Sequence, residues 1–274
     1  MRLLLKLLTK DTSLSLNYNF FLSSAINKLL QFDSPQFSKF LHQRGYPVDG
    51  KMYRLFSFAL IFEKTDLAYP AISILSPQAK LYITSPIVDD FIRSHFIRTF
   101  HNQSLEILEH SCKISFTIEQ IESLPDPVFG EVNYFKPLSP FILSVKRAWR
   151  HKFTQYYFRY TDDITEINAA LNENLKSKYE MIYKKPYAGK DVTFAWDENY
   201  ISAYLQKNKK LIKKITLLKR GFQPVEYIGN KIPFTLTGSK ELINVGYQCG
   251  FGEKTSMGFG LVEAVNNYEL RITN

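Results

Sequence analysis

Four of the twelve glycines of this 274-residue chain lie within eleven residues near its C-terminus, in the run CGFGEKTSMGFG. Glycine permits positive φ angles and lets a backbone approach a ligand closely. Successive exposed N–H groups in such a turn form a concavity that binds anions. A cation and two hydroxyl donors, the groups that hold a phosphate backbone, stand between the glycine pairs. The candidate binding residues of this glycine loop, residues 250–260, are Gly250, Gly252, Lys254, Thr255, Ser256, Gly258 and Gly260.

Two familiar phosphate-binding motifs do not fit the glycine loop. Gly252 and Gly258 are wrongly spaced for a dinucleotide fingerprint, and no Gly-Lys-Ser/Thr run opens a helix. A plain turn or bulge explains the spacing equally well. The whole chain carries 35 Lys and Arg against 26 Asp and Glu, a net charge of +9. This basic excess favours a polyanionic partner and therefore favours RNA as the ligand of the loop.

The five histidines are the candidates for acid–base chemistry, because the pKa of histidine lies near neutrality. His42 stands in the last turn of a short predicted helix, where the negative end of the helix dipole favours imidazolium. Its position alone fits a helix C-capping residue better than a catalyst. The other four lie on an apolar stripe, beside a polar turn or in a basic stretch: His95, His101, His110 and His151.

Basic residues gather in two further segments, 207–220 and 146–152. Lys213 in the first and Arg147 in the second are candidate RNA-backbone contacts. Such contacts make binding dependent on salt rather than on sequence. A solvated basic face explains either cluster alone equally well.

The composition predicts a folded protein of two modest domains. Hydrophobic residues make up 45% and aromatic residues 15% of the chain, which excludes a disordered one. The two cysteines, Cys112 and Cys249, have no spacing typical of a disulfide scaffold or a metal site. The start, MRLLLKLLTK, is too short and too interrupted by charge for a signal peptide or a membrane span. We therefore expect a soluble cytoplasmic protein with no membrane partner.

The hydrophobic pattern of the first half predicts the order strand, helix, strands, helix, strand. The first strand is expected at 2–8 and buried on both faces, and a helix with apolar residues from Phe21 to Leu30 follows, capped by Asn17 or Asn19. Ser-Pro pairs start further helices at residues 34 and 85. The remaining predictions are a strand at 52–62, a paired hairpin of 71–75 with 80–84, and a strand at 112–121.

A proline-rich segment, LPDPVFG at 124–130, predicts the boundary between two domains, 1–125 and 126–274. The second half repeats the order of the first, with a long helix at 164–183 capped by Asp162 or Asp163. A strand at 132–145 is expected to be broken near Pro137 and Pro140. The other expected elements are strands at 191–196, 210–219, 232–236 and 260–265 and a helix near 240–246. The fold class predicted is α+β, two tandem ferredoxin-like domains, each an antiparallel sheet with helices on one face.

Several segments together resemble the RAMP proteins, in particular the CRISPR-associated repeat-processing endoribonucleases of the Cas six family. The most specific is GYQCGFGEKTSMGFGLVEA around the glycine loop. The others are RLLLKLL, NYNFFLSSAINKLL, FLHQRG before an aromatic strand, and FKPLSPFILS at the start of the second half. These segments are spread over the whole length, and the family has two ferredoxin-like domains in tandem.

The resemblance implies a metal-independent endoribonuclease that needs no cofactor and cleaves CRISPR repeat RNA. Attack by the 2′-hydroxyl would leave a 2′,3′-cyclic phosphate and a 5′-hydroxyl. His42 falls where the family carries its catalytic histidine, and Arg54 or Lys51 would stabilise the phosphate. The family often adds a tyrosine on the preceding helix, but that position here is Asn27, and Tyr18, Tyr46 and Tyr53 are the candidate substitutes.

The alternative is a non-catalytic RNA-binding subunit of a CRISPR effector complex, which Asn27 supports. Such a protein would have other effector subunits as partners. The sequence leaves open whether the chain is a monomer or a homodimer.

Overall fold

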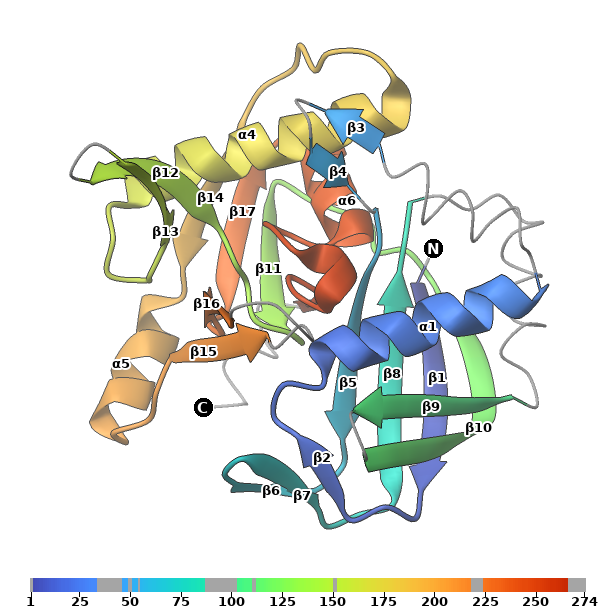
Figure 1. Cartoon of the computed structure of the whole chain (residues 1–274). Coiled ribbons are helices and arrows are strands. Elements are labelled where there is room, and N and C mark those ends of the chain that lie inside the picture. The colour runs from blue at the N-terminus through green and yellow to red at the C-terminus, as the bar shows by residue number, and fades with distance from the viewer. Residues whose placement is uncertain are drawn as a thin grey trace. The chain divides into compact units, whose positions relative to one another are not determined.

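The structure is a computed structural model that describes residues 2–33, 46–48, 51–53, 55–86, 103–109, 112–149, 152–217 and 224–265 (Figure 1). By its internal contacts the chain falls into two compact units. The first unit is Met1–Asp126 together with Ser256–Gly258, and the second is Pro127–Thr255 together with Phe259–Asn274. Three residues of the glycine loop thus belong to the first unit.

The first unit is built on an antiparallel sheet with the strand order β5-β8-β1-β10-β9. Without the edge strand β9, the strands β1, β5, β8 and β10 are the first to fourth in chain order and lie in the order 2-3-1-4, which is the ferredoxin-like arrangement. The strands are β1 (Arg2–Thr9), β5 (Ser57–Phe62), β8 (Gln78–Thr84), β9 (Ser104–Glu109) and β10 (Cys112–Leu124).

Helix α1 (Asn19–Asp33) covers one face of this sheet (Figure 1). Successive side chains of a strand point to opposite faces, so Leu3, Leu5 and Leu7 of β1 share a face. All three are buried in one core with Leu22 and Ile26 of α1. The other face of β1 is buried at Arg2 and Leu4 and half-buried at Lys6 and Leu8, so the prediction from the nearly continuous apolar run is met in part.

Two predictions for the first unit are wrong in their pairing. The segment 71–75 does not pair with 80–84, because β7 (Ala71–Ile74) pairs with β2 (Ser13–Ser15) and β6 (Thr65–Ala68), whereas β8 joins the main sheet. The expected strand at 52–62 is two strands, β4 (Lys51–Tyr53) and β5, and β4 pairs with β3 (Tyr46–Val48). The helices predicted from residues 34 and 85 fall on residues outside the described ranges.

The second unit repeats the topology in the sheet β14-β17-β11-β18. Its strands β11, β14, β17 and β18 again lie in the order 2-3-1-4, and the helices α4 and α6 contact each other. The bounds are β11 (Val132–Pro137), α4 (Ile164–Tyr183), β14 (Val192–Trp196), β17 (Phe234–Gly238), α6 (Lys240–Cys249) and β18 (Val262–Val265). The sheets and helices therefore have the predicted fold class, tandem ferredoxin-like domains.

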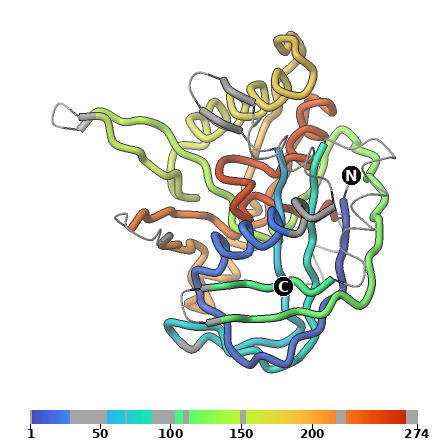
Figure 2. Tube along the Cα trace, turned by 45° about the vertical axis from the view of Figure 1, so that its right-hand side comes forward, coloured from blue at the N-terminus to red at the C-terminus, as the bar shows by residue number. Residues whose placement is uncertain are grey.

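Two hairpins and a short helix are added to this second frame, and Figure 2 shows the hairpins extending from it. The elements are β12 (Ser144–Trp149) with β13 (Lys152–Tyr157), β15 (Ile212–Leu217) with β16 (Val225–Asn230), and α5 (Glu198–Gln206). The break predicted near Pro137 and Pro140 is confirmed, because β11 ends at Pro137 and β12 begins at Ser144. No helix in the described ranges is long and apolar enough to cross a membrane.

Helix α4 has the bounds that the sequence predicts. The Asp163 side chain accepts a hydrogen bond from the backbone N–H of Thr165 at its start. Asn168 and Asn172 each exchange two hydrogen bonds with the backbone of the edge strand β14, at Phe194 and Val192. These contacts satisfy edge groups that would otherwise be open to pairing with another strand, and they fix α4 against the sheet.

Candidate nucleic-acid interface

The glycine loop leaves α6 at Gly250 and returns to β18 after Gly260. Its two ends are clamped by backbone hydrogen bonds: Phe251 N–H to the Gly260 carbonyl (2.8 Å), Glu253 N–H to the Ile142 carbonyl (2.7 Å) and Gly260 N–H to the Pro140 carbonyl (2.9 Å). These three amides are satisfied within the protein and do not face a ligand. The open concavity of amides expected from the sequence is therefore not formed by this part of the loop.

Glycine is required at both ends of the clamp. Gly252 has φ +75° and Gly260 has φ +70°, in the left-handed region. A Cβ atom at Gly252 would collide with the Ile142 carbonyl oxygen, and one at Gly260 with the Phe251 carbonyl oxygen. Both glycines allow two backbone segments to approach closely, so here the glycines serve the shape of the loop.

Below the first turn of the loop lies Lys178 of α4, a lysine that is only 2% exposed. Its Nζ donates hydrogen bonds to the carbonyls of Gly250 (2.7 Å) and Gly252 (2.6 Å). Burial lowers the pKa of Lys178 to about 8, although Cys249 and Glu253 nearby raise it. Burial also raises the pKa of the Cys249 thiol to about 12, so this neighbour is neutral near pH 7.

The middle of the loop presents Lys254 to solvent, at a positive φ of 55°. A short 3₁₀ turn, η1 (Thr255–Met257), follows with Thr255 buried. Side chains of α1 bind the carbonyls of the last two residues of this turn and of the residue after it. Asn19 Nδ2 donates to Met257 (3.1 Å) and Gly258 (3.4 Å), and the Ser23 hydroxyl donates to Ser256 (2.7 Å). Of the candidate residues Lys254, Thr255 and Ser256, Lys254 is thus the exposed one.

Asn19 was expected as one of two candidate caps of α1. The helix instead begins at Asn19, and the side chain of Asn19 holds the loop carbonyls. This loop contact joins residues more than two hundred positions apart, which a local capping rule does not consider.

Asn27, at the position of the family's tyrosine, is buried and its Nδ2 donates to the Ser23 carbonyl (2.8 Å). Tyr18, one candidate substitute, donates its hydroxyl to the Leu60 carbonyl (3.4 Å). Burial raises the pKa of Tyr18 to about 12. Neither side chain therefore offers an accessible acid or base near neutral pH.

Arg147 and Lys213 lie on the two hairpins rather than in the loop. The Arg147 guanidinium forms an ion pair with Glu166 (2.6 Å) and stacks over the Tyr156 ring, 3.8 Å from its centroid. Burial, followed by the charge of Lys231, lowers the pKa of Lys213. The hairpin of Arg147 begins beside the loop, because the Ser144 hydroxyl donates to Glu253 Oε1 (2.7 Å).

The proposed catalytic side chains fall outside the described residues. This applies to His42 and Arg54 and to the other four histidines, and for Lys51 only the backbone, in β4, is described. In the described ranges no three His, Cys, Asp or Glu side chains are grouped as a metal site would require.

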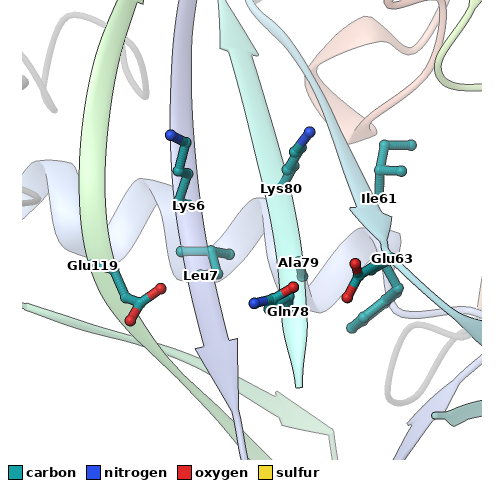
Figure 3. A pocket seen from close by; sticks show the side chains of 9 residues that line it. Lys6, Leu7, Ile61, Glu63, Gln78, Ala79, Lys80 and Glu119 are labelled. Atoms are coloured by element: carbon teal, nitrogen blue, oxygen red, sulfur yellow. The ribbon is translucent and has the colours of Figure 1, made fainter. Parts of the chain in front are cut away.

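A pocket on the sheet of the first unit has no counterpart among the predicted sites (Figure 3). Lys6 and Lys80 face each other there across β1 and β8, together with Glu63 and Glu119. Lys6 is also paired with Glu122 at 2.6 Å. Because positive and negative groups are mixed at this pocket, it lacks the uniform charge of a phosphate-binding surface.

Comparison with known proteins places the chain in a family. The model "CRISPR associated protein Cas6, C-terminal" matches residues 124–264. CRISPR-associated endoribonuclease Cas6 1 of Methanocaldococcus jannaschii is 26% identical, over 97% of this chain and 94% of that protein. A solved structure of a CRISPR associated protein Cas6 is 26% identical with a TM-score of 0.72, covering 97% of this chain and 99% of its own.

A second solved structure, from a study of a Cas6-related gene of Pyrococcus furiosus, has a TM-score of 0.76 at 23% identity, covering 97% and 99% of the two chains. It shares the fold. The residues matched by the family model include the glycine loop, both hairpins and the second sheet up to Ala264. This chain belongs to the Cas6 family.

Proposed function

We propose that this chain is a metal-independent endoribonuclease that cleaves CRISPR repeat RNA. The 2′-hydroxyl next to the scissile phosphate attacks the phosphorus, the bond to the 5′-oxygen breaks, and the products are a 2′,3′-cyclic phosphate and a 5′-hydroxyl. Family membership supports the activity, since the relative from Methanocaldococcus jannaschii is named an endoribonuclease.

One observation carries the RNA-binding half of the proposal, namely the exposed Lys254 at the middle of a loop clamped at both ends. A cation on a rigid backbone suits a phosphate, because little conformational freedom is lost on binding. Thr255 and Ser256 stand beside it in the turn. Arg147, on the hairpin that starts next to Glu253, and Lys213 extend the positive surface along the RNA backbone.

The catalytic half of the proposal rests on His42 as general acid or base, with Arg54 or Lys51 on the phosphate. Histidine alone can serve, because the nucleophile belongs to the RNA and the reaction needs only proton transfer and charge stabilisation. Asn27 and Tyr18 take no part in proton transfer, since one is an amide in a helix and the other a half-buried phenol whose pKa is raised to about 12. The reaction is placed in the cytoplasm, where the repeat transcript is made.

The second candidate is a non-catalytic RNA-binding subunit of a CRISPR effector complex. It is favoured by Asn27, a buried amide at the position of the family's tyrosine, and by the raised pKa of the Tyr18 phenol. Binding of repeat RNA would then remain while cleavage would not.

One experiment separates the two candidates. Purified protein is incubated with repeat RNA in EDTA, and the products are tested for 2′,3′-cyclic phosphate ends. We expect such ends from the wild type and none from His42→Ala, which should still bind the RNA. Binding by the wild type without cleavage would select the effector subunit instead. Full activity of His42→Ala would remove this residue from the mechanism.

A further inference from the structure

Lys178 is a buried ammonium group whose contacts are with the glycine loop. It lies on the apolar side of α4 with Leu171 and Leu175, both fully buried. Among the described residues it forms no ion pair, and its hydrogen bonds go to the carbonyls of Gly250 and Gly252. Glu253 raises the pKa of Lys178 but is not in an ion pair with it, and burial of a charge without a paired countercharge disfavours the folded state. An apolar side chain of the same length would fill this space without that cost, so stability alone does not account for a lysine here.

The end of α6 explains how the ammonium is held. Gly250 is the C-cap of α6, where the backbone carbonyls carry the negative end of the helix dipole. Two hydrogen bonds of 2.6–2.7 Å from a charged donor are stronger than neutral ones. The ammonium of Lys178 therefore binds the backbone at the junction of α6 and the glycine loop.

These two bonds also set the orientation of the peptide groups in the loop. A trans peptide is planar, so its N–H points opposite to its C=O. With the Gly250 and Gly252 carbonyls turned to Lys178, the N–H groups of Phe251 and Glu253 point away from it. They meet the Gly260 and Ile142 carbonyls, the hydrogen bonds that clamp the loop. Lys254, the exposed cation, is the next residue.

We propose that Lys178 is a positioning residue for RNA binding, whose buried charge holds the glycine loop in the shape that presents Lys254 to the RNA backbone. The proposal rests on the proposed function of the loop. The charge also lies directly under the loop, in a medium of low polarity, where it adds to the attraction of a phosphate.

The strength of the two hydrogen bonds from Lys178 to the loop carbonyls depends on the proton of Lys178. The titratable groups facing it are Cys249 from the end of α6 and Glu253 from the loop. The thiol stays neutral to about pH 12, so it does not change near neutrality. Loss of the Lys178 proton above about pH 8 leaves an amine that holds the two carbonyls less strongly. RNA affinity should fall through this range for that reason.

The test compares three variants, Lys178→Met, Lys254→Ala and Lys176→Met, all in a His42→Ala background to keep the RNA intact. Lys176→Met is the matched control, because it removes the same charge from the same helix at an exposed ion pair with Asp191. The affinity for fluorescent repeat RNA is measured by anisotropy from about pH 7 to about pH 9.5. Urea unfolding of each variant shows whether the fold is intact.

We expect Lys178→Met to bind RNA about tenfold more weakly at pH 7 while unfolding at no lower urea concentration. The difference from its parent should shrink towards pH 9.5, and Lys176→Met should differ less than about twofold. If Lys254→Ala weakens binding and Lys178→Met does not, the positioning role of Lys178 is overturned. The loop then remains an RNA contact through Lys254. If neither variant changes affinity, the loop is not an RNA contact. The role of Lys178 then fails together with the RNA-binding role proposed for the loop. Should Lys178→Met unfold, the parent protein that retains Lys178 still provides a test. An RNA affinity of the parent that does not change from about pH 7 to about pH 9.5 would contradict the positioning role of the Lys178 charge.

Discussion

The hydroxyl of Ser23 donates a 2.7 Å hydrogen bond to the carbonyl of Ser256, 233 residues further along the chain. Ser23 in turn receives a hydrogen bond at its own carbonyl from Asn27. One turn of α1 is thereby tied to the tip of the glycine loop. The segment that carries the family's tyrosine position and the loop proposed to grip RNA thus belong to one hydrogen-bonded chain.

Removal of this tie should loosen the loop tip. We expect Ser23→Ala to lower the free energy of unfolding by about 1 kcal/mol, because the part-buried Ser256 carbonyl loses its donor. RNA affinity should fall as well. Ser24→Ala is the matched control, since that exposed hydroxyl bonds only to the Phe20 carbonyl within the helix. Urea titration measures the free energy of unfolding and anisotropy measures the RNA affinity. Equal values for Ser23→Ala and Ser24→Ala would show that the hydrogen bond from Ser23 to Ser256 contributes to neither.

Asn27 should matter for structure and not for proton transfer. Its Nδ2 is already engaged with the Ser23 carbonyl in the interior of the unit. We expect Asn27→Ala to cost about 1 kcal/mol of stability and to change the single-turnover cleavage rate less than about threefold. A drop of about a hundredfold in rate with an unchanged unfolding curve would instead place Asn27 in the mechanism.

Periodic segments of the chain were predictable, and pairings between distant segments were less so. Helix α4 keeps a strict apolar stripe and an aspartate cap, and its bounds agree with the prediction. By contrast, β6 and β7 lie in a sequence whose turn residues fit several pairings, and the expected hairpin was wrong. Strand β9, strand β16 and helix α5 were not predicted. The two strands have only six residues each, so their local pattern is weak.

The loop was found from its glycines, but its supporting residues were not. Lys178 occupies a position on the apolar stripe of α4, three residues after Leu175 and one before Tyr179, both buried. A charged residue on such a stripe is a signal that sequence reasoning could have used. The role of Asn19 had no such signal, because its partners Met257 and Gly258 are distant in the chain. Tertiary contacts of this kind leave no periodicity.

The last glycine of the loop should not tolerate a side chain. Gly260→Ala places a Cβ against the Phe251 carbonyl oxygen at a φ of +70°. Strain and a broken clamp together should lower the free energy of unfolding by about 2–4 kcal/mol. Gly130→Ala is a suitable control, because a Cβ there would meet only the Val132 carbonyl oxygen at an ordinary 3.9 Å. Thermal unfolding of the two variants provides the comparison, and equal melting temperatures would contradict the clamp.

The buried charge of Lys178 also predicts how stability depends on pH. Its pKa in the folded chain is about 8, below the ordinary value of 10.5. Between these values the unfolded state binds the extra proton, so the free energy of unfolding rises with pH. The penalty is fully present below pH 8 and gone above 10.5, which corresponds to roughly 3 kcal/mol.

Lys178→Met removes this penalty at every pH. We expect the variant to be more stable than the wild type at pH 7, with an advantage that shrinks as the pH rises towards 10. Urea unfolding at several pH values measures it, and Lys176→Met, at an exposed ion pair, should show no such trend. RNA affinity should move the opposite way, since the same deprotonation that relieves the fold releases the Gly250 and Gly252 carbonyls. An advantage independent of pH would mean that folding does not lower the pKa of Lys178, and the loss of the Lys178 proton near pH 8 would then be excluded as the cause of any change in RNA affinity.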